Sequence, residues 1–184
     1  FGKSLKNSAK SLKNPGFEES CEIPRNQGCF RYFAKDWKVT LNSGTDACGA
    51  HRSRDAHAGK HSLALVAKEA NAFISARQTL PVEPGQPIRF SVWTKGTEGA
   101  RGYVRFYFYD KAGKQIGGYV PMGVRPKSNW RKFETRFQVP DGPASMKRSL
   151  DNSKSLESAT VYYDDAALEV GGEDTPENAW IRDN

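Results

Sequence analysis

Hydrophobic and polar residues alternate along most of the chain, and turn-forming residues interrupt the alternation at Pro84-Gly85, 111–114 and Asp141-Gly142-Pro143. Period-two alternation places every second side chain on one face, as in a strand that covers a core. The expected strands are Trp37–Leu41, Ser62–Ala67, Ala72–Leu80, Pro87–Lys95, Gly102–Asp110, Gln115–Val120, Trp130–Val139 and Thr160–Val170. The pattern predicts an all-β fold in which two antiparallel sheets pack as a sandwich.

The segment Gly102–Asp110, with the sequence GYVRFYFYD, has the clearest alternation. Its apolar face carries Val104, Phe106 and Phe108. Its other face carries Tyr103, Arg105, Tyr107 and Tyr109. The preceding strand repeats the pattern and places Trp93 and Lys95 on its polar side. If the two strands share a sheet, these residues join the tyrosines in one aromatic and cationic surface.

The 184 residues are enough for one domain of ordinary size, and 37% of them are hydrophobic. This composition argues against a disordered chain, and no apolar run approaches the roughly 20 residues that span a bilayer. KSLKN occurs at 3–7 and again at 10–14, so we interpret residues 1–13 as a basic leader or linker. Residues 14–170 are the expected folded domain, which we expect to be monomeric, and residues 171–184 are an acidic linker.

The formal net charge is +7, although residues 161–184 carry 1 basic and 7 acidic side chains. A basic body attracts polyanions such as anionic glycans, but a solvated excess of Lys and Arg has the same composition. The chain has no helix-turn-helix, finger or RNP-like motif. The leader's Leu5 and Leu12 bury too little surface to bind a membrane well. We therefore expect neither nucleic acid nor a membrane as the partner.

Signals for catalysis are weak. No G-x-S-x-G segment is present to carry a nucleophile. Pairs of carboxylates for glycoside hydrolysis can be drawn from Glu134, Glu157, Asp164 and Asp165, but every small domain offers such pairs. The residues therefore favour a protein that binds rather than catalyses.

Two sets of residues are candidate metal ligands. Cys48, His51, His57 and His61 fall within fourteen residues, but their spacing matches no zinc site, and polar loop residues are the better interpretation. Calcium has a stronger case. Carboxylates from Glu18, in the first ordered segment, and from Asp164-Asp165, in the last strand, would tie the two ends of the domain together. The alternative is an idle, solvated pair of carboxylates.

The three cysteines, Cys21, Cys29 and Cys48, lie in a stretch with loop character. One disulfide and one free thiol is one arrangement, and a Cys21–Cys29 bond would close the shortest loop. The sequence leaves the pairing open. Cysteines in such a setting favour an oxidising compartment, so we expect a secreted or cell-surface protein.

Several segments, taken in order, resemble the jelly-roll carbohydrate-binding modules of secreted bacterial enzymes that degrade polysaccharides. They are Asn14-Pro15-Gly16-Phe17-Glu18, Trp37, Asp55–Leu63, Val82–Lys95, the hairpin 108–113, Trp130 with Phe133, Phe137 and Pro140, and Val161–Asp165. Together they cover residues 14–170. The resemblance implies a jelly-roll β-sandwich without catalytic activity, attached to a glycoside hydrolase or a polysaccharide lyase.

The resemblance also implies two sites. A structural Ca²⁺ would be held by Gly16, Glu18, Lys60 and Asp164, with backbone oxygens from Gly16 and Lys60. A polysaccharide would bind on a concave aromatic sheet face. The positions that suit this face are Trp93, Lys95, Tyr103, Arg105, Tyr107 and Tyr109, with charge from Arg77 and a rim at Tyr119. Trp37 and Trp130 match positions that pack in the fold.

Sugar rings pack their C–H groups on aromatic faces, and a guanidinium can bind a uronate carboxylate or a sulfate in a bidentate manner. With the net charge of +7, this slightly favours an acidic polysaccharide over a neutral one, and the expected partner is an acidic or β-linked plant or algal glycan. The chain departs from the family pattern in the long basic segment Ser20–Arg54. It departs again at Met146–Ser158, which we interpret as an insertion between the last strands.

Two alternatives stay open. The chain would be a jelly-roll lyase or hydrolase that acts on an acidic glycan, or an extracellular domain whose aromatic face binds a protein. The sequence does not identify the polysaccharide, its linkage or the attached enzyme. It also does not separate binding to chain ends from binding to internal stretches.

Overall fold

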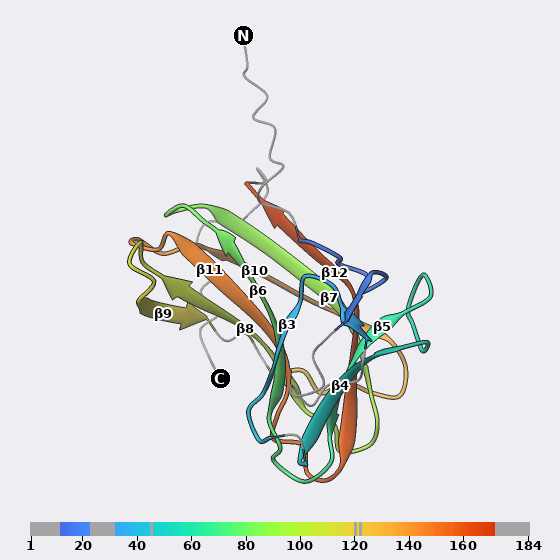
Figure 1. Cartoon of the computed structure of the whole chain (residues 1–184). Helices are drawn as coiled ribbons and strands as arrows, with labels where there is room; N and C mark the ends of the chain where they lie inside the picture. The colour runs from blue at the N-terminus through green and yellow to red at the C-terminus, as the bar shows by residue number, and fades with distance from the viewer. Residues whose placement is uncertain (1–11, 23–31, 45, 120, 122, 172–184) are drawn as a thin grey trace.

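The computed structural model describes residues 12–22, 32–44, 46–119, 121 and 123–171, and every regular element in these ranges is a strand (Figure 1). This part of the chain therefore holds no helix that could cross a membrane. The strands are β1 (Ser20–Glu22), β2 (Tyr32–Ala34), β3 (Lys38–Leu41), β4 (Cys48–Ser53), β5 (Ser62–Ala67), β6 (Ile74–Pro81), β7 (Pro87–Gly96), β8 (Gly102–Tyr109), β9 (Gln115–Tyr119), β10 (Arg131–Gln138), β11 (Ser145–Asn152) and β12 (Ala159–Val170).

Ten of these strands form two five-stranded antiparallel sheets that pack as a sandwich, which confirms the predicted fold class (Figure 1). One sheet has the order β10-β7-β12-β5-β4, and the other has the order β3-β6-β11-β8-β9. We name them the β12 sheet and the β11 sheet after their central strands. Strands β1 and β2 form a separate two-stranded ribbon. Consecutive strands such as β7 and β8 therefore lie in opposite sheets.

The core lies between the two sheets and contains the predicted inward residues of β8, which are Val104, Phe106 and Phe108. Phe106 meets Phe90 of the opposite sheet, with their ring centroids 5.5 Å apart. The hydroxyl of Tyr163 on β12 donates a 2.6 Å hydrogen bond to the backbone carbonyl of Asp151 on β11, which joins the sheets. Gly102 is required beside this bond, because a β-carbon there would clash with both of its oxygen atoms.

The expected insertion at Met146–Ser158 is wrong, because β11 occupies Ser145–Asn152 and is the central strand of its sheet. Its alternation is hidden in the sequence. The residues Lys147, Ser149 and Asp151 face outward, as polar residues should, but two polar residues, Arg148 and Asn152, face the core. A strand that is polar on both faces lacks the period-two signal.

The loop character expected around Cys48 is also wrong. This residue begins β4, is fully buried and has a free thiol, which donates a 3.0 Å hydrogen bond to the carbonyl of Gly44. The side chain of Cys21 and the whole of Cys29 lie outside the described residues, so the expected Cys21–Cys29 bond stays a prediction. The first KSLKN copy and residues 172–184 lie outside them as well.

The core contains a charged residue, Arg148. Its side chain is fully buried, and none of its three guanidinium nitrogens has a hydrogen-bond partner. The guanidinium lies over the rings of Trp37 and Phe90, at 4.8 and 5.3 Å from their centroids. Burial lowers the pKa of Arg148 to about 9, since an apolar environment disfavours the charged form.

We expect Arg148→Met to stabilise the protein. Replacing a buried charge by an apolar side chain of similar length removes its desolvation cost, and replacements of buried ionic groups range from neutral to a gain of about 4 kcal/mol in the free energy of unfolding. Urea unfolding at pH 7 measures the change. The control is Arg131→Met at an exposed position of β10, which we expect to stay within about 0.5 kcal/mol of the parent. A less stable Arg148→Met protein would contradict the assignment of an uncompensated charge.

Candidate functional site

The outer face of the β11 sheet gathers polar and aromatic side chains in rows, because residues that face each other in neighbouring strands project to the same side. Along β8, four residues alternate with the core and stay half-buried: Tyr103, Arg105, Tyr107 and Tyr109. One row across the strands consists of Lys38, Arg77, Ser149 and Arg105. The next rows place Lys147 between Thr79 and Tyr107, and Asp151 between Ser75 and Tyr103. The sheet thus brings together five of the predicted binding residues.

Contacts between neighbours fix the orientation of Arg105. Its guanidinium lies over the ring of Tyr103 at 4.7 Å and near the ring of Phe73 at 5.4 Å. Its Nε is 3.3 Å from Oδ2 of Asp151, whose Oδ1 accepts hydrogen bonds from the Tyr103 amide and the Ser153 hydroxyl. Burial raises the pKa of Asp151 to about 6, although the nearby Arg105 opposes the rise.

A similar contact fixes Lys147 on β11. Its ammonium group donates a 2.7 Å hydrogen bond to the hydroxyl of Tyr109 and lies 4.4 Å from the centre of that ring. Arg105 and Lys147 therefore each sit against a tyrosine of β8. The result is a surface on which flat aromatic groups and cations alternate.

Two hollows flank this surface. The larger, of about 570 Å³, lies where β6 extends beyond its pairing with β3, and Lys38, Thr40, Arg77, Thr79 and Lys147 are among its lining residues. Lys13 adds a further cation and Asp36 a carboxylate. The smaller, of about 470 Å³, lies at the start of β8, where Arg101, Tyr103 and Arg125 line it. An extended ligand could follow the face from one hollow to the other.

The grouping of Trp93 and Lys95 with the tyrosines is wrong, because β7 and β8 lie in different sheets. Both residues lie on the outer face of the β12 sheet, where the segment 55–61 contacts them. The ring of His57 stacks on Trp93 at a centroid distance of 3.8 Å. Asp55 forms a 2.6 Å ion pair with Lys95.

The expected rim position of Tyr119 is also wrong. This residue lies on β9, and its ring packs toward the core beside Phe106 and Phe137. Its hydroxyl lies 3.2 Å from the hydroxyl of Thr135. Of the two tryptophans expected to pack in the fold, Trp37 is buried in the core, and Trp130 is half-buried with its ring steeply inclined to the ring of His57, at a centroid distance of 6.1 Å.

Sequence reasoning missed the polar residues that β11 and β3 contribute to the face, which are Lys38, Thr40, Lys147, Ser149 and Asp151. For Lys38 and Thr40 the signal was their alternation with apolar residues in the expected strand Trp37–Leu41, and for β11 it was the alternation of Met146 and Leu150 with polar residues. Arg148 breaks that alternation at its centre.

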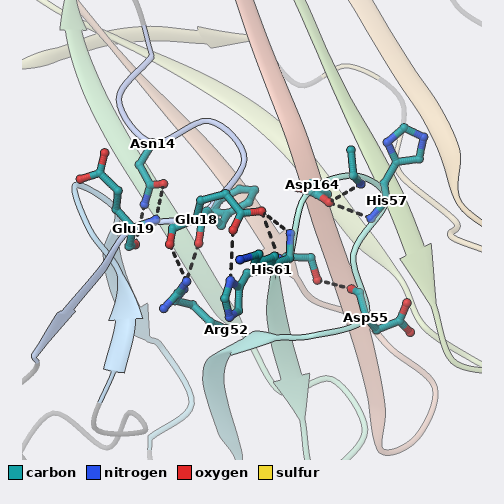
Figure 2. A network of polar contacts seen from close by, with 12 residues as sticks. Asn14, Glu18, Glu19, Arg52, Asp55, His57, His61 and Asp164 are labelled. Carbon is teal, nitrogen blue, oxygen red and sulfur yellow. Dashed lines mark hydrogen bonds and ion pairs between the residues drawn. The ribbon is translucent and has the colours of Figure 1, made fainter.

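The four residues predicted to hold calcium do come together, around the segment 55–61, which we call the clamp loop. Oε1 of Glu18 accepts hydrogen bonds from the amides of Lys60 and His61, at 2.6 and 3.1 Å. Oδ2 of Asp164 accepts from the amides of His57 and Ala58, at 2.7 and 3.2 Å. Figure 2 shows the two carboxylates at different parts of the loop, Glu18 beside His61 and Asp164 beside His57. Gly16 lies near Glu18 and Asp165.

The two carboxylates differ in their titration. Partial burial acts to raise the pKa of Glu18, but hydrogen bonds from Lys60 and His61 together lower it. Burial raises the pKa of Asp164 against the opposing hydrogen bonds from three amides. Two carboxylates and nearby backbone carbonyls are donors that suit Ca²⁺. Within the described ranges, no group of three or more His, Cys, Asp and Glu side chains is arranged to hold a metal.

The former zinc candidates are separated by the fold. Cys48 and His51 belong to β4, whereas His57 and His61 belong to the clamp loop. The ring nitrogens of these two loop histidines contact carboxylates, His57 at Asp165 and His61 at Glu18. The histidines therefore take part in the polar network of the loop.

Comparison with known proteins identifies the architecture. No family model and no curated protein sequence matches the chain. Among solved structures, the CBM22-1 xylan-binding domain of Paenibacillus barcinonensis Xyn10C matches with a TM-score of 0.60 and 15% identity, over 89% of this chain and 96% of that domain. TmCBM61, solved with β-1,4-galactotriose, matches with a TM-score of 0.53 and 19% identity, over 88% of this chain and 99% of that one.

The fold is that of carbohydrate-binding modules. The resemblance found in the sequence is thus confirmed for the fold. The enzymatically active domain of bacteriophage CBA120 tailspike protein 4 also matches, with a TM-score of 0.61 and 17% identity. That match covers 74% of this chain, which spans about a fifth (19%) of the tailspike domain.

The raised pKa of Asp151 predicts a pH dependence of stability. Because the folded protein holds this proton up to about pH 6, and the unfolded chain only to about pH 4, the free energy of unfolding falls as the pH rises between these values. The fall amounts to about 3 kcal/mol. We expect Asp151→Asn to remove it. Urea unfolding between pH 4 and 7 measures the difference, with the exposed Asp141→Asn as control, and an unchanged slope in Asp151→Asn would contradict the assignment.

Proposed function

We propose that this chain is a non-catalytic module that binds a polysaccharide along the outer face of the β11 sheet. The observation that carries the proposal is the outward row of Tyr103, Arg105, Tyr107 and Tyr109 on β8, held against the polar residues of β11. Tyrosine rings offer flat surfaces for sugar C–H groups and hydroxyls for hydrogen bonds. Two solved neighbours, a xylan-binding domain and a module in complex with β-1,4-galactotriose, support the same class of ligand.

The clamp loop supports the choice of face. It contacts Trp93 and Lys95, the aromatic and cationic pair on the β12 sheet, so these side chains already have partners within the chain. On the β11 sheet, by contrast, Tyr103 lines the smaller hollow, and Arg77 and Lys147 line the larger one. We therefore place the ligand on the β11 sheet and leave Trp93, Lys95 and Tyr119 outside the site.

The ligand in this proposal is an acidic polysaccharide rather than a neutral one. The face and its larger hollow carry Lys38, Arg77, Arg105 and Lys147. The carboxylates near them are Asp36 and the buried Asp151. We further propose that the module acts outside the cell or on its surface, where it directs an attached polysaccharide-degrading enzyme to its substrate.

A second candidate is an enzyme that cleaves an acidic glycan, and the tailspike match favours it. Glycoside hydrolysis uses two carboxyl groups on either side of the scissile bond. On the face described above, Asp151 is engaged with Arg105 and with the Tyr103 amide. Release of reducing sugar ends from the bound polymer would support the enzyme, and binding without release supports the module.

We expect Tyr107→Ala to weaken polysaccharide binding by about 1–3 kcal/mol, because it removes a stacking surface at the centre of the face. The matched control is Tyr162→Ala, which removes a half-buried tyrosine from the outer face of the β12 sheet. Affinity electrophoresis in gels that contain xylan, galactan or pectic polymers measures both. Equal losses in the two variants would contradict the choice of face.

We also propose that Ca²⁺ stabilises the clamp loop, with Glu18 and Asp164 as carboxylate ligands and Gly16 and Lys60 as carbonyl ligands. The convergence of these residues from the first ordered segment and the last strand supports the site (Figure 2). A hard cation there would strengthen an attachment that the structure makes through amide hydrogen bonds.

Removal of calcium should therefore lower the melting temperature, and added Ca²⁺ should restore it, because a ligand that binds only the folded state stabilises it. Glu18→Gln keeps an acceptor for the Lys60 amide but loses the charge, so its melting temperature should no longer respond to Ca²⁺. Glu19→Gln, at an exposed neighbour that pairs with Lys35, should respond like the parent. An unresponsive parent protein would remove calcium from the proposal.

A further inference from the structure

Four residues on neighbouring strands form a row across the outer face of the β11 sheet: Lys38, Arg77, Ser149 and Arg105. We call it the basic row. Ser149 lies at its centre on β11, flanked by Arg77 of β6 and Arg105 of β8. The row runs from the larger hollow, which Lys38 and Arg77 line, to strand β8.

Two donors in this row lack partners. Ser149 is 1% exposed, and its hydroxyl makes no hydrogen bond. The Nε of Arg77 is buried and makes none either. A buried donor without a partner destabilises a fold, so native proteins leave few of them, and each one calls for an explanation. Here two stand opposite each other in adjacent strands and on the same face.

Arg105, at the β8 end of the row, is held in place by its neighbours within the chain. Arg105 is held between the Tyr103 ring and the carboxylate of Asp151. Arg77 forms no ion pair with any residue in the described ranges. Its charge acts on Asp151, whose pKa it helps to lower, and on the larger hollow, where Lys38 and Lys147 add to it and Asp36 opposes it. The local field is positive, which attracts an anion and not a hydroxyl in particular.

Building on the proposed function, we propose that Arg77 and Ser149, with Arg105 beside them, form a subsite for the negatively charged group of an acidic polysaccharide. That group is an oxyanion, either the carboxylate of a uronate or a sulfate ester. The Arg77 N–H and the Ser149 O–H donate to its oxygens, which gives both orphan donors a partner. Guanidinium and hydroxyl donors together favour such an oxyanion over a neutral hydroxyl. Tyr107, two residues along β8 from Arg105 and on the same face, contacts the adjoining sugar ring.

The test compares each polymer with its uncharged counterpart. The probes are polygalacturonate with its fully methyl-esterified form, and a sulfated galactan with its desulfated form. Binding of the whole chain is measured by affinity electrophoresis and calorimetry at low and high salt. The variants are Arg77→Gln, Arg77→Lys and Ser149→Ala. The control is Lys132→Ala, which removes a cation from the outer face of the β12 sheet.

We expect the parent to bind one of the charged polymers at least about tenfold more tightly than its uncharged form. Arg77→Gln should abolish that preference and leave affinity for the uncharged form unchanged. Ser149→Ala should reduce it several-fold, and Lys132→Ala should not alter it. Arg77→Lys keeps the charge, so it should retain binding at low salt and lose it at high salt. The preferred charged polymer identifies the oxyanion as carboxylate or sulfate.

Three outcomes would overturn the subsite. Equal binding of charged and uncharged polymers by the parent, with Tyr107→Ala still weakening both, would leave the proposed function intact and remove the subsite. An equal loss by Arg77→Gln on both forms would assign the row to hydroxyl recognition. An unaltered preference in Arg77→Gln and Ser149→Ala would place charge recognition elsewhere. Failure of every polymer to bind would instead defeat the proposed function itself. If Arg77→Gln fails to fold, as judged by circular dichroism, Ser149→Ala and Arg77→Lys decide.

Discussion

Two carboxylates hold the clamp loop in place, and the difference between the outer faces of the two sheets depends on them. Glu18 comes from the first described segment and Asp164 from the last strand, and both accept hydrogen bonds from amides within five consecutive residues, 57–61. Held in this way, the loop stacks His57 on Trp93 and pairs Asp55 with Lys95 on the β12 sheet. The clamp loop thus covers Trp93 on that face, whereas on the opposite face Tyr103 lines the smaller hollow.

In the other sheet, the central strand β11 limits the arrangement through its polar residues. It is polar on both sides, and each side has a cost: Arg148 is desolvated in the core, and Ser149 lacks a partner on the outer face. Asp151 connects the two environments. Its backbone carbonyl accepts the hydroxyl of Tyr163 from the β12 sheet, and its carboxylate orients Arg105. The orientation of the Arg105 guanidinium therefore depends on the same residue that joins the two sheets.

The comparisons fit this division between framework and face. A sandwich requires alternating residues of suitable volume between two sheets, and many sequences meet that requirement, so 15–19% identity is compatible with nearly complete coverage. Residues that point outward are free to differ between proteins that share the fold, and ligand choice resides in them. On this chain the outward residues include a row of cations around a buried hydroxyl. That row, more than the fold, distinguishes this face from any other sheet surface.

The sequence by itself determined the strands with clean alternation and the character of β8, because side-chain direction along a strand is a local property with a period of two. It also predicted that Glu18 and Asp164 would lie close together, because the segments that contain them resemble the first and last segments of carbohydrate-binding modules. It did not determine which strands share a sheet, so Trp93 and Lys95 were assigned to the wrong face. Sheet membership depends on pairing between residues distant in sequence. Nor did it predict β11, because an arginine in the sequence indicates a surface position. Only the structure places Arg148 against the rings of Trp37 and Phe90. Only the tertiary structure set Ser149 between Arg77 and Arg105, because that arrangement depends on the register of three strands.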